Sequence, residues 1–250
     1  MRIVIAARGY NPTKGGHIVL HKLCDSLLRM GLDVYMKPHS KHWAVNPNYL
    51  SQVTHEVTDD DFVIYHNSIE GNPFKAKRWI RWMLYRPAKI YDGFLVFYSE
   101  QFGPGPYLRV IEPHLDIFYN KGLERSGECW TWRKAQREGF KPEDRPKSGY
   151  EIPRGTDNHT LSNIFNNYKT FVSYDPATFL CVQSALCGCD TVAPKLVGNT
   201  FPYPGVARSM KDIPRAREEH GLLREVIEKE YREQDVNAAE VITKLIKEVK

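Results

Sequence analysis

The stretch that decides the fold is Val172-Ser-Tyr-Asp-Pro-Ala-Thr-Phe-Leu-Cys-Val-Gln-Ser-Ala-Leu-Cys-Gly-Cys-Asp190. A short apolar strand ends before Asp175-Pro176, a helix follows, Gly188 ends that helix, and a second strand resumes at residues 191–193. Two strands joined by so short a helical connection predict a parallel sheet. Tyr174, Asp175 and the first helical turn should then lie at the carboxyl edge of the sheet, where α/β folds bind ligands.

The same stretch indicates what this sheet edge binds. A helix N-terminus offers free N–H groups and a partial positive charge, which suit a ligand that bears phosphate. Asp175 and Gln183, eight residues apart, are polar side chains within the unit. An ordinary buried strand–helix–strand unit with an accidental polar residue would give the same pattern, so the rest of the sequence has to decide.

Length and composition describe an ordinary globular chain. The 250 residues suffice for one large domain or two small ones, and 42% hydrophobic and 26% charged residues are typical of such proteins. The net charge of +5 fits polyanionic partners, including nucleotide diphosphates, acidic membrane surfaces and nucleic acid, without selecting one. No apolar run approaches the roughly 18 residues that span a bilayer. The early charge at Arg2 argues against a signal peptide.

The five cysteines favour reduced, buried thiols. Their number is odd, and Cys187-Gly-Cys189 lacks the usual spacing of a metal site. Because reduced thiols are typical of the cytoplasm, we expect a cytoplasmic protein.

The rest of the chain alternates between strands and helices. The expected strands cover residues 2–7, 33–36, 62–65, 94–98, 108–111 and 128–132, and the expected helices cover residues 17–30, 72–85, 213–233 and 237–249. Residues 117–127 are a plausible hinge. Two successive α/β halves of similar size predict a doubly wound, two-lobed fold.

A second ligand-binding turn lies at Gly15-Gly16, between the first strand and the first helix. Without side chains there, main-chain N–H groups can come close to a ligand. The turn is not G-x-G-x-x-G, which disfavours a nicotinamide enzyme. The chain also has no G-x-S-x-G elbow and no phosphate-binding G-x-x-x-x-G-K-[ST] loop, so a hydrolase or kinase has little support.

Both turns resemble those of GT-B glycosyltransferases of the retaining, family-four type. In that family two glutamates eight residues apart flank a small-residue helix that reads LEAMACGTPVV, and Asp175 and Gln183 stand at their positions here. Residues 15–34 follow the pattern that begins the family's acceptor domain. Residues 65–82 and 205–216 resemble segments of a small bacterial and viral branch of these enzymes.

The resemblance implies an α/β fold of two Rossmann-like lobes (GT-B) with parallel sheets and a cleft between them. Residues 1–122 would form the acceptor lobe and residues 123–235 the nucleotide-sugar lobe. Residues 236–250 would form a C-terminal helix that packs back on the first lobe.

The implied activity is hexosyl or pentosyl transfer from a UDP- or GDP-sugar to an acceptor hydroxyl, with retention of configuration and without a metal or other cofactor. By the resemblance, Asp175 would be catalytic. His66 is the second catalytic candidate, because it follows a strand at the carboxyl edge of the sheet and could orient or deprotonate an acceptor hydroxyl. The donor-binding residues would be Gly15, Gly16, Arg133, Lys134, Tyr174, Pro176, Ala177, Thr178 and Gln183. The acceptor-binding residues would be Asn72, Arg78 and Arg81.

Two alternatives stay open at this stage. The departures at Asp175 and Gln183 would also fit a catalytically weakened relative that only binds a nucleotide or sugar. The acceptor would be a glycan or, on weaker grounds of charge and viral resemblance, modified DNA. A viral protein of this kind would act in the cytoplasm of its host cell.

Overall fold

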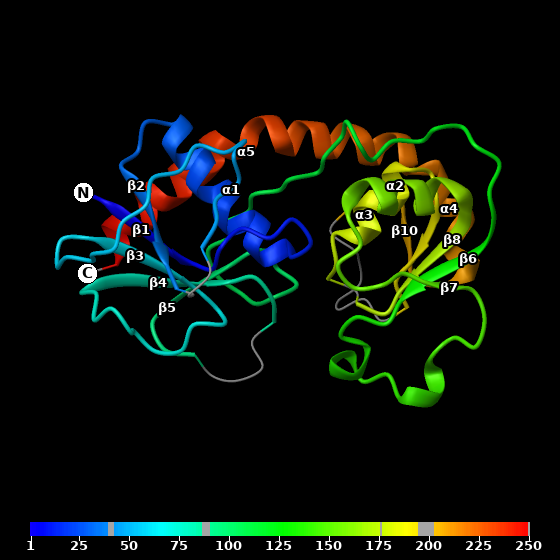
Figure 1. Ribbon diagram of the computed structural model, residues 1–250, viewed down its shortest axis with the longest axis horizontal. Coiled ribbons are helices and arrows are strands. Elements are labelled where there is room, and N and C mark those ends of the chain that lie inside the picture. Colours follow the sequence, from blue (N-terminus) through cyan, green and yellow to red (C-terminus); the bar gives the residue numbers. More distant parts are fainter. Residues whose placement is uncertain (40–42, 87–90, 176, 195–202, 250) are drawn as a thin grey trace. The chain divides into compact units, whose positions relative to one another are not determined.

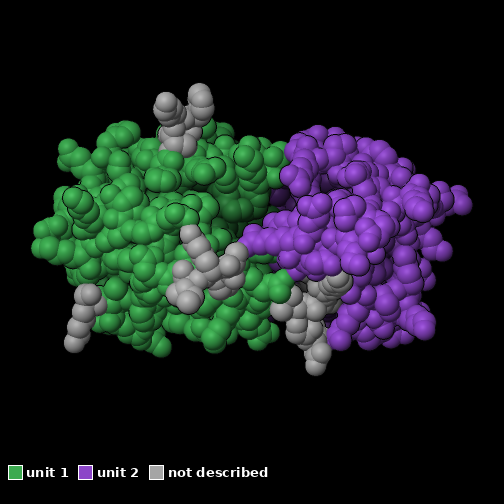
Figure 2. Space-filling model, turned by 90° about the horizontal axis from the view of Figure 1, so that it is seen from below, with its two compact units in different colours: residues 1–112, 230–250 green, residues 113–229 purple. Residues whose placement is uncertain are grey.

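The computed structural model describes residues 1–39, 43–86, 91–175, 177–194 and 203–249. The chain divides into two compact units, shown in separate colours in Figure 2. Unit 1 comprises Met1–Glu112 and Glu230–Lys250, and unit 2 comprises Pro113–Lys229. Each unit has its own sheet, labelled in Figure 1.

The sheet of unit 1 has five parallel strands in the order β2-β1-β3-β4-β5. The strands are β1 (Ile3–Ala7), β2 (Val34–Pro38), β3 (Phe62–His66), β4 (Arg78–Met83) and β5 (Phe94–Phe97). The described residues of unit 1 contain helix α1 (Gly15–Arg29) and most of the long helix α5 (His220–Glu248), which begins in unit 2 and ends in unit 1.

Alternating side chains of β1 build a core on each face of this sheet. Ile3, Ile5 and Ala7 lie in a cluster with apolar residues of α1 and α5, whose spacing gives each helix one buried stripe. These helix residues are Leu20, Leu23, Cys24 and Leu27 of α1, and Ala238, Ile242 and Leu245 of α5. Val4 and Ala6 pack on the other face against the segment that joins β3 to β4.

Two of the elements expected in unit 1 are wrong, and the two C-terminal helices have other bounds than expected. Within the helix expected at residues 72–85, Arg78–Met83 form strand β4 instead, because Ile80 and Trp82 are buried on one face in a period of two. Residues 108–111 form no strand; the only pairing nearby is an isolated bridge between Phe97 and Tyr107. The two expected C-terminal helices are replaced by α4 (Ile213–Glu218) and α5, since no Gly or Pro interrupts the sequence near residue 235.

The sheet of unit 2 also has five parallel strands, in the order β10-β9-β8-β6-β7. These are β6 (Ser126–Thr131), β7 (Tyr150–Glu151), β8 (Tyr168–Ser173), β9 (Asp190–Val192) and β10 (Val206–Ala207). The helices α2 (Asn158–Asn167) and α3 (Leu180–Leu186) accompany them, with short 3-10 turns η1 (Ala135–Glu138), η2 (Pro142–Asp144) and η3 (Met210–Asp212).

Counted within its own unit, each sheet has the strand order 2-1-3-4-5. In such a sheet the second strand lies on one side of the first strand, and the third strand lies on its other side. The place where the order reverses is the switch point, and ligands bind there, outside the carboxyl ends of the strands. The switch points lie between β1 and β3 in unit 1 and between β6 and β8 in unit 2. The expected α/β fold with two parallel sheets is confirmed.

Candidate functional site

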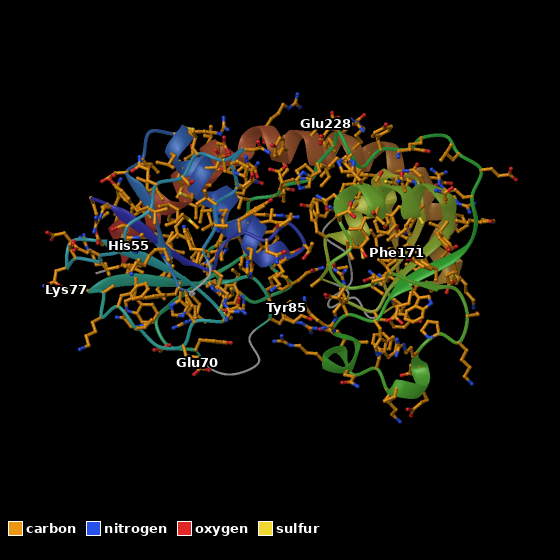
Figure 3. All side chains as sticks on the ribbon, viewed as in Figure 1. His55, Glu70, Lys77, Tyr85, Phe171 and Glu228 are labelled. Carbon is orange, nitrogen blue, oxygen red and sulfur yellow. The ribbon has the colours of Figure 1, made fainter. Side chains whose placement is uncertain are left out.

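The switch point of unit 2 brings two of the expected site segments together. Thr131, the last residue of β6, pairs with Ser173, the last residue of β8. The chain therefore continues side by side into residues 132–134 and 174–175, and the N–H of Tyr174 donates to the carbonyl of Thr131 at 3.2 Å. Phe171, labelled in Figure 3, marks the buried part of β8 just before this edge.

An ion pair joins the two segments. The Nζ of Lys134 lies 2.9 Å from Oδ2 of Asp175, whose side chain is only 3% exposed. Lys134 has a left-handed backbone with φ of 56°, a conformation that is costly for a residue with a side chain and that is often found at functional sites. The structure therefore holds a buried carboxylate and its cationic partner at the edge where a ligand would bind.

Arg133 adds a second cation to this edge. Burial lowers the pKa of its guanidinium, and the neighbouring charge of Arg154 lowers that pKa further, whereas Asp175 raises it. Its Nη2 donates to the carbonyl of Pro153 at 3.2 Å, and its buried Nε has no hydrogen-bonding partner in the part of the chain that the structure describes. The two guanidinium groups repel each other, and an anion bound between or beside them would relieve this repulsion.

Sequence reasoning missed Arg154. It follows β7, the strand next to β6, so it reaches the same carboxyl edge. A strand of two residues gives no periodic signal, and only the charge pattern Pro153-Arg154-Gly155 could have suggested it.

Three aromatic rings lie beside the charged groups. The ring centroids of Trp132 and Tyr174 are 4.6 Å apart, and the ring of Phe140 meets that of Tyr174 edge-on at 5.0 Å. All three side chains are half-buried. Such rings offer a flat apolar face to a sugar or a base.

The turn after Asp175 differs from expectation. Helix α3 begins only at Leu180, and Pro176 lies outside the described residues. The N–H groups of Ala177 and Thr178 donate to Oδ1 and to the carbonyl of Asp175, at 3.2 and 3.3 Å. These two N–H groups are therefore occupied within the chain and not free for phosphate. Gln183 lies on α3 and is 7% exposed.

The switch point of unit 1 holds His66 and the Gly15-Gly16 turn. His66 ends β3 and is buried, and burial is the first cause that lowers its pKa to about 4. Its Nδ1 accepts from the backbone N–H of Ser68 at 3.3 Å and contacts the Ser68 hydroxyl at 2.9 Å. The ring is therefore neutral at pH 7 with its proton on Nε2, so it donates a hydrogen bond more readily than it accepts a proton.

Gly15 and Gly16 begin helix α1 and are both exposed. A Cβ at Gly15 would meet nothing within 4 Å. The space beside it is therefore open to a ligand atom, and the chain itself does not require glycine there.

The three expected acceptor residues differ in their contacts and in their place on the sheet of unit 1. The Asn72 side chain closes its own turn, accepting from the Tyr65 hydroxyl at 2.9 Å and the N–H of Ala76 at 3.0 Å. Arg78 begins β4 and therefore lies at the amino edge of the sheet. Arg81 is fully buried, and its guanidinium donates to the carbonyls of Ile69 and Gly71. The contacts of Asn72 hold its own turn, and those of Arg81 hold the segment of Ile69 and Gly71.

In the described ranges, no group of three or more His, Cys, Asp or Glu side chains is placed to hold a metal ion. No described helix combines the length and apolar character needed to cross a membrane. All five cysteines are buried and free of disulfides, as expected.

Comparison with known proteins rests on structure alone. No protein family and no curated protein matches the sequence. The T4 phage β-glucosyltransferase matches over 98% of this chain and 99% of its own, with 11% identity and a TM-score of 0.54. The chain shares the fold of that enzyme. A sucrose-phosphate synthase from Thermosynechococcus elongatus (12% identity, 98% and 94% coverage, TM-score 0.47) and the T4 enzyme in complex with UDP-glucose (11%, 98% and 95%, 0.45) match less well by TM-score.

Proposed function

We propose that the chain is a glycosyltransferase whose unit 2 binds the diphosphate of a UDP- or GDP-sugar. The observation that carries this proposal is the set of cations at the β6/β8 switch point: Lys134 paired with Asp175, and Arg133 beside Arg154. Negative charge builds on the leaving diphosphate as the glycosidic bond breaks, and fixed cations stabilise it. The fold shared with a β-glucosyltransferase is consistent with this chemistry.

Different residues of unit 2 would bind different parts of the donor. Arg133 and Arg154 would grip phosphate oxygens through paired N–H groups, and Lys134 would act as a point charge. When Lys134 exchanges Asp175 for the diphosphate as its partner, the buried Asp175 carboxylate becomes available. It would then accept hydrogen bonds from the sugar or stabilise the positive charge that develops on the sugar ring. Gln183 would bind the ribose, and Trp132, Phe140 and Tyr174 would cover an apolar face of the donor.

Unit 1 would bind the acceptor molecule. His66 would orient that hydroxyl by donating from Nε2, because its low pKa and its contact with Ser68 do not suit a general base. We propose hexosyl or pentosyl transfer with retention and without a metal, to a glycan hydroxyl or, as the alternative, to modified DNA. The anomeric configuration of the product, read by NMR, decides retention.

A second candidate function has one observation in its favour. Asp175 is already neutralised by Lys134, as it would be in a relative that binds nucleotides without turnover. Thermal shift with UDP, GDP, ADP, TDP and CDP tests donor binding, because a ligand that binds only the folded state raises the melting temperature. Release of nucleoside diphosphate from sugar nucleotides then separates the two: the transferase releases it, and the binding relative shows the thermal shift alone.

A further inference from the structure

Three neighbouring strands of unit 1 each end on a basic side chain. Arg8 follows β1, His39 follows β2, and His66 is the last residue of β3. These strands are adjacent in the order β2-β1-β3, and the N–H of His39 donates to the carbonyl of Ala7 at 2.7 Å. The three side chains therefore reach the same carboxyl edge of the sheet.

Helix α1 adds two more basic groups at this edge. Nδ1–H of His17 donates to the carbonyl of Gly9 at 2.7 Å, which fixes the ring beside the end of β1 and leaves Nε2 for another partner. Lys14 precedes the helix and is exposed. We call Arg8, Lys14, His17, His39 and His66 the strand-end basic cluster.

The strand-end basic cluster has no acidic partner in the described residues. The charged groups that act on its three histidines are Arg8, Lys14, Lys37 and Arg81, together with the histidines themselves, and all of them lower the pKa of the histidine concerned. Some described cations elsewhere in unit 1 are paired, as Arg2 is with Asp61 and Lys22 with Asp25. The switch point therefore carries several positive groups without a described acidic partner.

We propose that the strand-end basic cluster binds one phosphate group carried by the acceptor. This inference rests on the proposed function and names the class of its acceptor. An anion would relieve the mutual repulsion of the cluster, and His17, protonated beside the phosphate, would donate from Nε2 to one of its oxygens. The open space beside Gly15 lets the ligand come close to the start of α1.

The extent of the cluster favours a single phosphate over a long polyanion. Adjacent strands lie about 4.8 Å apart, so three strand ends span roughly 10 Å, which suits one phosphate and its ester. A stripe that follows a nucleic-acid backbone would need cations along several phosphates. Arg78 and Lys77 lie at the amino end of β4, at the other edge of the sheet, and extend no such stripe.

The test is histidine-ring NMR on the full chain, titrated with pH at constant ionic strength in chloride, inorganic phosphate or a hexose 6-phosphate. We expect either phosphate compound to raise the pKa of His17 and of His39 relative to chloride. Arg8→Gln should weaken phosphate binding about tenfold, as expected for a hydrogen bond to a charged group. Lys77→Gln is the matched control, because it removes the same charge from an exposed pair at the amino edge (Figure 3) and should change nothing.

The outcomes distinguish a sugar phosphate from nucleic acid as the ligand, and they test the phosphate site separately from the transferase function. Binding of the hexose 6-phosphate, but not of the unphosphorylated hexose, supports the inference. Unchanged histidine pKa values at millimolar phosphate would overturn the inference. Tighter binding of an oligonucleotide than of the hexose 6-phosphate, with a salt dependence that indicates contacts to several phosphates, would also overturn it. Arg133→Gln should leave these titrations unchanged. If no nucleoside diphosphate binds but phosphate still raises the two histidine pKa values, the transferase proposal fails and the phosphate site stands.

Discussion

Lys134 and Asp175 form an ion pair of 2.9 Å across the ends of β6 and β8, with the carboxylate buried and the ammonium partly exposed. Each residue follows a different strand, so only the pairing of Thr131 with Ser173 brings them together. Donor binding as proposed depends on this ion pair.

Replacing Lys134 by Ala should lower turnover about 100- to 1,000-fold, the usual effect of removing one group that stabilises transition-state charge. The affinity for nucleoside diphosphate should fall as well, because one phosphate contact is lost. Steady-state kinetics and calorimetric titration measure the two effects. Lys134→Arg keeps the charge and should retain most of the binding; full turnover in Lys134→Ala would exclude the assignment.

Arg154→Gln should weaken binding of nucleoside diphosphate about tenfold, because a hydrogen bond between charged groups contributes about 1.5–3 kcal/mol. Isothermal titration of UDP and GDP checks this value. Lys147→Gln removes the same charge from an exposed residue that precedes β7, and it should have no effect. Equal affinities of the two variants would remove Arg154 from the donor site.

Arg81→Met should lower the free energy of unfolding by about 2–4 kcal/mol, since the carbonyls of Ile69 and Gly71 lose their buried donor. Urea unfolding followed by circular dichroism measures the loss. Arg78→Met is the control on the same strand, because it removes a largely exposed contact to Asp60. Equal stability of the two variants would show that Arg81 does not hold this loop.

Stability should fall as the pH drops from 6.5 towards 4, in part because of His66. Its pKa is about 4 in the folded chain and 6.5 when unfolded, so the unfolded state binds more protons in this range. The stability contributed by the neutral ring is complete above pH 6.5 and is lost as the pH falls through this window, by up to about 3 kcal/mol. Thermal melts of the wild type and His66→Gln at several pH values give the difference, which should shrink towards pH 4; a difference that is constant with pH would contradict the buried neutral ring.

The sequence predicted the parallel sheets because the unit at residues 172–190 and the first strand and helix have strong, separate periodicities. It did not predict β4, where Trp79 and Arg81 alternate with buried Ile80 and Trp82, because cationic and aromatic residues obscured the period of two. It placed Lys134 and Asp175 in one site through the resemblance, but their ion pair depends on strand register, which local pattern does not encode. Arg154 was missed because β7 is too short to detect.

The most direct test of the central claim is the release of nucleoside diphosphate from a panel of UDP- and GDP-sugars by the wild type and by Lys134→Ala. We predict that the wild type releases UDP or GDP from at least one donor when an acceptor is present, and that Lys134→Ala releases it at least 100-fold more slowly, about 3 kcal/mol of transition-state stabilisation. No release from any donor by the wild type, or equal release by both proteins, would contradict the account.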